Sequence, residues 1–251
     1  MHMNQAPHLP WLKDGIAFPH PERAWGADSP APGLLAAGAE LTPKRLIQAY
    51  SQGIFPWFSA GQPVLWFCTD PRMVLRPTQF AGHHALIKKI RKLRREQRLI
   101  VTFDHDFVQV MRHCAQMPRA EQKGTWIGPE MMQAYALLHQ QGLAQSVTTW
   151  IDGHLAGGLY AVTLGRMVFG ESMFSLQSDG SKIALSALVA WALSHQLPLI
   201  DCQQETGHLR FMGARPIARS LFLQEVQALV KMPSPEWSFQ PELWQHLGLG
   251  L

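Results

Sequence analysis

The sequence predicts a mixed α/β (α+β) fold, with one mixed sheet flanked by helices and a small N-terminal domain in front of it. Three observations support this. The first 62 residues are rich in Pro and Gly and contain one clear helix, the remainder alternates between helical and strand patterns, and tight turns join three consecutive strand patterns. A chain of 251 residues that is 47% hydrophobic can bury one large core or two unequal ones. We place the domains at residues 1–62 and 63–251.

In the N-terminal domain, Thr42 is a typical N-cap, Pro43 suits the first turn, and Gly53 ends the helix. The apolar face of this helix consists of Leu46, Ile47 and Tyr50. Two aromatic segments follow, GIFPWF from Gly53 to Phe58 and VLWFCTDPRMVL from Val64 to Leu75. An aromatic loop of this kind indicates a packed lid or a stacking surface, and packing is the more common outcome.

The second part of the chain starts with a helix and continues in a regular order. The predicted elements are strand Leu99–Phe103, a helix capped by Asp104 and reaching Gln116, helix Pro129–Gln141, strands Ser146–Ile151, His154–Leu164 and Met167–Phe174, helix Ser181–Gln196, strand Leu197–Cys202, a Gly-rich turn over 207–213, and helix Ser220–Val230. Asp152-Gly153 and Gly165-Arg166 supply the turns of the antiparallel strands. This order resembles the acyltransferase fold of the N-acetyltransferase superfamily, whose sheet splays to admit an acyl donor.

The helix at the start of this part is strongly basic. Between Lys88 and Arg98 seven cations oppose the single Glu96, a net charge of +6 in a chain whose total is +4. Leu86, Ile87, Ile90 and Leu93 recur at helical spacing and place an apolar stripe on the opposite side. A cationic face on a slightly acidic protein is typical of polyanion binding, and nucleic acid is preferred over an anionic membrane surface. The cations are Lys88, Lys89, Arg91, Lys92, Arg94, Arg95 and Arg98.

Composition points to a cytoplasmic protein without metal. No apolar stretch approaches the roughly 18 residues of a membrane span, and the N-terminus lacks a signal-peptide pattern. The three scattered cysteines do not form a disulfide framework, and the twelve histidines occur without HExxH or paired CxxC motifs. We therefore expect no metal site and no cofactor.

Three blocks carry polar residues among apolar ones: GESMFS from Gly170 to Ser175, LPLIDCQQE from Leu197 to Glu205, and GTWI from Gly124 to Ile127. Glu171 and Asp201 are as compatible with structural carboxylates as with catalytic ones. Cys202 follows an apolar run and suits a small buried residue better than a nucleophile.

Taken together, GIFPWF, DPR at Asp70–Arg72, GTWI, GESMFS, the Ser181-Lys182 pair and LIDCQ at Leu199–Gln203 closely resemble the bacterial leucyl/phenylalanyl-tRNA–protein transferases. The resemblance extends from about Leu34 to Arg219. It implies an aminoacyltransferase that moves Leu or Phe, and less readily Met, from aminoacyl-tRNA to the α-amine of proteins that begin with Arg or Lys, and so marks them for degradation. The donor ester is already activated, which agrees with the absence of a GxxxxGK[ST] loop. A monomer is expected.

The resemblance also implies site residues. Asp201 and Gln203 lie at the reaction centre, where Asp201 accepts a proton or orients the amine and Gln203 positions the ester. Glu171 either orients the aminoacyl end or attracts the cationic acceptor. An apolar pocket for the amino acid is formed by Leu159, Met173, Leu185, Leu188 and Ile200. Trp57 and Trp126 stack on the terminal adenosine, and the basic helix contacts the tRNA through charge. The identity of the proton acceptor is left open.

Two other readings compete. An acetyl-coenzyme A N-acetyltransferase requires a [QR]xxGx[GA] loop, but Gln177–Lys182 reads QSDGSK and places Lys182 where a small residue is needed. A non-catalytic RNA-binding protein explains the basic helix but not Glu171, Asp201 and Gln203.

Overall fold

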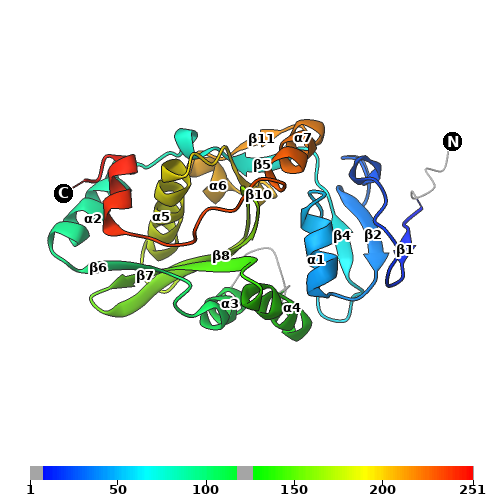
Figure 1. The fold of residues 1–251 in the computed structure, drawn as a ribbon, viewed down its shortest axis with the longest axis horizontal. Helices are drawn as coiled ribbons and strands as arrows, with labels where there is room; N and C mark the ends of the chain where they lie inside the picture. Colours follow the sequence, from blue (N-terminus) through cyan, green and yellow to red (C-terminus); the bar gives the residue numbers. More distant parts are fainter. Residues whose placement is uncertain (1–7, 118–126, 251) are drawn as a thin grey trace.

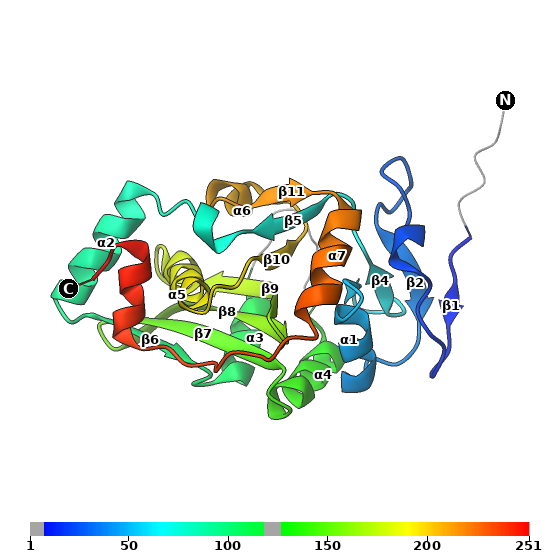
Figure 2. The same ribbon diagram turned by 45° about the horizontal axis from the view of Figure 1, so that its top comes forward.

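A computed structural model describes residues 8–117 and 127–250, which form two sheets (Figures 1 and 2). The smaller sheet has four strands in the order β1-β2-β4-β3. Its strands are β1 (Trp11–Leu12), β2 (Leu34–Gly38), β3 (Phe55–Pro56) and β4 (Leu65–Phe67), and it is accompanied by the 3-10 helix η1 (Pro21–Arg23) and by α1 (Pro43–Tyr50). The Thr42 hydroxyl accepts a hydrogen bond from the Arg45 N–H, which confirms the predicted N-cap of α1.

The larger sheet has seven strands in the order β11-β5-β10-β9-β8-β7-β6. They are β5 (Arg72–Leu75), β6 (Leu99–Phe103), β7 (Ala144–Ile151), β8 (His154–Leu164), β9 (Met167–Ser175), β10 (Ile200–Gln203) and β11 (Arg215–Ile217). The helices are η2 (Pro77–Gln79), α2 (His84–Arg95), α3 (Phe107–Gln116), α4 (Pro129–Gln140), α5 (Gly180–Ser194), α6 (Gly207–Phe211), α7 (Arg219–Leu229) and η3 (Pro241–Leu247).

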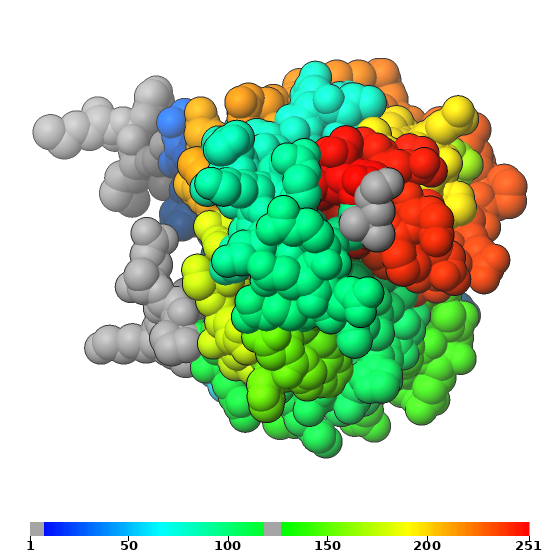
Figure 3. Space-filling view, turned by 90° about the vertical axis from the view of Figure 1, so that its left-hand side faces the viewer, coloured from blue at the N-terminus to red at the C-terminus, as the bar shows by residue number. Residues whose placement is uncertain are grey.

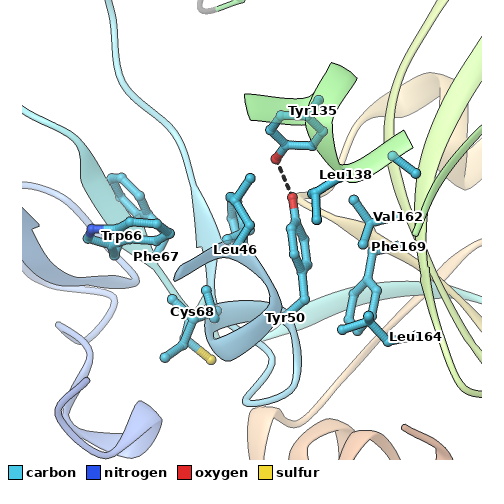
Figure 4. Close-up of a cluster of buried hydrophobic side chains, with 14 of the residues drawn as sticks. Leu46, Tyr50, Trp66, Phe67, Cys68, Tyr135, Leu138, Val162, Leu164 and Phe169 are labelled. Carbon is cyan, nitrogen blue, oxygen red and sulfur yellow. Dashed lines mark hydrogen bonds between the residues drawn. The ribbon is translucent and has the colours of Figure 1, made fainter. Parts of the chain in front are cut away.

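Helices cover both faces of the larger sheet. In Figure 1, α3 and α4 lie below the sheet, α5 lies above it, and α1 stands beside α4 at the junction with the smaller sheet. Each face has its own hydrophobic cluster. One contains Phe169, Phe174 and the buried side chains of α1, α3, α4 and the smaller sheet, and the other contains Val168 and most of α5. The first cluster joins the smaller sheet to the larger one (Figure 4).

These observations confirm the predicted fold class, a mixed sheet flanked by helices after a small N-terminal region. The hairpin β7–β8 turns at Asp152-Gly153, as expected, because both residues adopt positive φ values of 53° and 76°. The division into residues 1–62 and 63–251 stays a prediction. Strand β4 follows residue 62 and pairs with β2 and β3 from the other side of that division.

Several local predictions were wrong. Val64–Leu75 is not a loop but contains β4 and β5, and its aromatic residues Trp66 and Phe67 are buried. Asp106, not Asp104, caps α3, because its carboxylate accepts the Gln109 N–H, while Asp104 accepts the Ser146 N–H. The turn predicted over 207–213 contains α6, and β11 and η3 were not predicted.

Within the two described stretches of the chain, no helix is both long enough and apolar enough to cross a membrane.

Candidate active site

The candidate site lies where two neighbouring parallel strands separate. β9 and β10 pair only through Ile200–Val168 and Asp201–Phe169, and beyond these pairs each strand carries a bulge. In β9 the extra residue is Glu171, since Ala161 pairs with Gly170 and Tyr160 pairs with Ser172. In β10 it is Cys202. A bulge redirects the side chains that follow it, so both strands change direction at the residues singled out from the sequence.

The Glu171 carboxyl group is held by three side chains from three different elements. Its Oε1 accepts hydrogen bonds from the Tyr50 hydroxyl at 2.7 Å and from Gln203 Nε2 at 2.9 Å. Its Oε2 accepts a hydrogen bond from the Tyr135 hydroxyl at 3.2 Å. The two tyrosine hydroxyls also contact each other, as the dashed line in Figure 4 shows. Helices α1 and α4 therefore meet on a carboxyl group of β9.

Burial raises the pKa of Glu171 to about 8, and the hydrogen bonds from Tyr50 and Tyr135 only partly oppose this. Burial of Tyr50 and Tyr135 raises their pKa well above the usual value, and the nearby charge of Glu171 raises it further. Both tyrosine hydroxyls therefore stay protonated. Two hydroxyl protons cannot fill the three oxygen–oxygen contacts among these groups. When Glu171 is protonated, its own proton supplies the third hydrogen bond, and one tyrosine then donates to the other tyrosine instead of to Glu171.

Asp201 is placed differently from Glu171. It is fully buried, and Arg72 donates from Nε to Oδ1 at 2.8 Å and from Nη2 to Oδ2 at 2.6 Å. Burial alone would lower the pKa of Arg72, but Asp201 more than compensates and the pKa lies above its usual value. This is a bidentate buried ion pair, and such a carboxylate is poorly placed to take a proton from a substrate.

Gln203 links the two carboxyl groups. Its N–H donates to Asp201 Oδ1 at 2.9 Å, while its side-chain amide donates to Glu171. Its φ of 60° lies in the left-handed region, which is uncommon for a residue other than glycine.

The predicted pocket residues lie on the other face of the sheet. Four of them are buried in the cluster around α5, and Met173 is half-buried against it. The bulge explains how Met173 and Glu171 face opposite sides although they are two residues apart, because the inserted residue reverses the alternation. The four buried residues are Leu159, Leu185, Leu188 and Ile200.

Of the two predicted adenosine contacts, Trp57 is half-buried with its ring against Phe67 at 5.4 Å between centroids. Trp126 lies outside the described residues.

The basic helix α2 forms as predicted, with Leu86, Ile90 and Leu93 buried. Figure 3 shows α2 at the centre of one face with the C-terminal segment beside it. Four of the seven cations have partners: Lys89 binds Asp179, Arg98 binds Asp152 and Glu96, and Arg91 and Arg94 donate to backbone carbonyls of the C-terminal segment. Lys88, Lys92 and Arg95 are exposed and bind no other described residue. Their spacing places them in one stripe along α2.

The sequence patterns do not indicate the roles of three residues in this arrangement. They place Tyr50 only on an apolar helix face, they do not single out Tyr135, and they include Arg72 only as part of a motif. A usable signal existed for the tyrosines, because the chain has just three and two of them converge on Glu171.

Two family models match the chain. The model described as leucyl/phenylalanyl-tRNA protein transferase matches residues 74–227, and the model of the N-terminal domain of the same proteins matches residues 39–70. The leucyl/phenylalanyl-tRNA--protein transferase of Polaromonas sp. is 53% identical over 95% of this chain and 94% of its own length. The protein of that name from Paraburkholderia xenovorans is 51% identical over 92% of this chain and 94% of its own length.

Similarities to solved structures are much weaker. A ribosomal-protein-alanine N-acetyltransferase from Brucella melitensis biovar Abortus 2308 has 14% identity and a TM-score of 0.31, over 57% of this chain and 96% of that chain. L-PGS from Bacillus licheniformis has 11% identity and a TM-score of 0.35, over 82% of this chain and 68% of that chain.

The raised pKa of Glu171 predicts a pH dependence of stability. The folded protein keeps a proton on Glu171 up to about pH 8, whereas an ordinary glutamate releases it near 4.5. The folded state thus binds more protons, and the free energy of unfolding falls as pH rises between these values, by up to about 1.4 kcal/mol per pH unit. Urea unfolding from pH 5 to 8 should show a shallower decline for Glu171→Gln, which has no proton to lose. Parallel curves for the two proteins would contradict the assignment.

Proposed function

The chain belongs to the leucyl/phenylalanyl-tRNA protein transferase family, and on this basis we propose that it transfers Leu or Phe, and less readily Met, from aminoacyl-tRNA to the α-amine of proteins beginning with Arg or Lys. The transfer marks these proteins for degradation in the cytoplasm. The observation that carries the mechanism is the Glu171 carboxyl group held by Tyr50, Tyr135 and Gln203 where β9 and β10 separate.

We propose Glu171 as the proton acceptor. The attacking α-amine has an ordinary pKa of roughly 8 and must lose a proton to attack the ester. A carboxyl group with a pKa of about 8 matches it, so proton transfer between the two costs little free energy. Glu171 is half-buried while Asp201 is fully buried, which favours Glu171 as the group that a substrate reaches.

Asp201 and Gln203 then position the reacting groups. Asp201 holds the Gln203 backbone, and the Gln203 amide keeps one hydrogen for the ester after donating the other to Glu171. As the amine attacks the ester carbonyl, Glu171 takes a proton from it, and the new amide bond forms as the bond to the ribose oxygen breaks. The proton then passes to that oxygen, so the tRNA leaves with its hydroxyl group restored. No cofactor takes part in this scheme.

We place the donor across the gap between the strands. The amino acid enters the apolar cluster of Leu159, Met173, Leu185, Leu188 and Ile200 on the α5 face, and the ester lies between β9 and β10. A pocket of aliphatic side chains with an adaptable methionine accepts both Leu and Phe. Trp57 and Trp126 remain the proposed contacts of the adenosine, and the protein is proposed to act as a monomer.

Direct transfer tests the proposal. The protein should move labelled Leu or Phe from charged tRNA to a peptide that begins with Arg, and not to the same peptide beginning with Ala.

Glu171→Gln should lower kcat about 10²- to 10⁴-fold by removing the proton acceptor. Glu130→Gln, an exposed change at the start of α4, is the matched control and should leave kcat unchanged. Transfer to neither peptide would refute the proposed function, and a normal kcat for Glu171→Gln would refute only the role of Glu171.

The free stripe on α2 predicts the RNA contact. Replacing Lys88, Lys92 and Arg95 together by Ala should weaken binding of all tRNAs alike, and the slope of log K against log salt should fall by about 2 to 3. The preference between Leu and Phe should not change, because phosphate contacts carry no amino-acid information. A triple Ala variant at the exposed cations Lys44, Arg112 and Lys231 removes the same charge elsewhere. Equal losses in both variants, measured by filter binding, would contradict a role for the stripe.

A further inference from the structure

Arg72 is a fully buried arginine behind the reaction centre. Its guanidinium group contacts two phenyl rings, 4.6 Å from the centroid of Phe55 and 4.5 Å from that of Phe222. Its Nε and Nη2 donate to Asp201, and Nη1 is buried without an acceptor among the described residues. A buried ion pair often stabilises a fold no better than apolar residues of the same size, so fold stability alone gives little reason for it.

Hydrogen bonds connect this ion pair to the reaction centre. Asp201 Oδ1 accepts both from Arg72 at 2.8 Å and from the Gln203 N–H at 2.9 Å. The second bond holds Gln203 in its left-handed conformation, beyond the bulge of β10. From there Gln203 Nε2 reaches Glu171 Oε1 at 2.9 Å. A change at Arg72 is therefore transmitted to Glu171 through Asp201 and one backbone N–H.

We propose that Arg72 is a positioning residue for aminoacyl transfer, which fixes Asp201 as a permanent acceptor for the Gln203 backbone and thereby aims the Gln203 amide at Glu171. The inference rests on the proposed function and deepens it. Arg72 is not itself a catalytic residue, because its side chain is fully buried and does not reach the substrate. The two rings hold its planar group in one orientation, which a flexible lysine would not reproduce.

The pair also sets the charge around Glu171. The titratable or charged groups that face Glu171 are Tyr50 from α1, Tyr135 from α4, Asp201 from β10 and Arg72 from β5. Asp201 raises the pKa of Glu171 more than Arg72 lowers it. Removing both charges together should therefore change the pKa of Glu171, whereas replacing Arg72 by lysine keeps the charge and changes the geometry.

Two variants separate these effects. Arg72→Lys should lower kcat about 100-fold, the scale expected when catalytic groups are misplaced by about 1 Å, with KM for charged tRNA unchanged. Arg72→Met/Asp201→Asn leaves no unpaired buried charge, so it is expected to fold even where a single change does not. It should lower kcat and also shift the titration of the Glu171 carboxyl group, followed by ¹³C NMR, away from that of the wild type.

The matched control removes another ion pair. Arg76→Met/Glu225→Gln breaks the bridge from Arg76 Nη2 to Glu225 Oε1 at 2.7 Å, which has no contact with Glu171, and should change neither kcat nor the Glu171 titration. The inference is overturned if folded Arg72 variants keep the wild-type kcat and titration, or if the control loses as much. The NMR titration needs no turnover, so it tests the link from Arg72 to Glu171 even in a protein that transfers no amino acid. A wild-type protein without transfer activity would refute the proposed function and not this link.

Discussion

The hydrogen bonds on the Glu171 carboxyl group are the interaction on which the arrangement of the molecule depends. Tyr50 at the end of α1, Tyr135 in the middle of α4 and Gln203 at the end of β10 all donate to it, so the smaller sheet region, a helix and the larger sheet meet at one group. Burial raises the pKa of this carboxyl group to about 8, and the hydrogen bonds from the tyrosines partly oppose that rise. The contacts that join the two sheets therefore also set the protonation of the group proposed as the proton acceptor.

Three tasks of the proposed reaction fall on separate parts of the structure. In the proposal, the charge on α2 binds the RNA backbone, the apolar cluster on the α5 face binds the amino acid, and the polar groups on the opposite face bind the amine. The separation of β9 and β10 connects the last two. This division explains how one enzyme could bind different tRNAs through phosphates and still select the amino acid by the shape of a pocket.

Much of this was predictable from local sequence patterns. Four features were predicted correctly because each depends on residues close together in the sequence. They are the cap at Thr42, the Asp152-Gly153 turn, strand Leu99–Phe103 and the basic helix. Strand β5 was missed because the aromatic residues before it suggested a loop, and its pairing with β10 and β11 reveals the strand. The bulge in β9 depends on its pairing with β8, and the bulge in β10 on its pairing with the distant strand β5. The convergence of Tyr50 and Tyr135 on Glu171 joins residues 121 and 36 positions apart, which periodicity does not encode.

The most direct test of the account is the pH dependence of single-turnover transfer in the wild-type protein and in Tyr50→Phe. The Tyr50 hydrogen bond lowers the pKa of Glu171, so its loss should raise that pKa and move the acid limb of the rate profile to higher pH. The amine of the acceptor peptide titrates identically in both reactions, and the difference between the profiles therefore reports Glu171. Profiles that coincide on the pH axis would show that the proton leaves by another route.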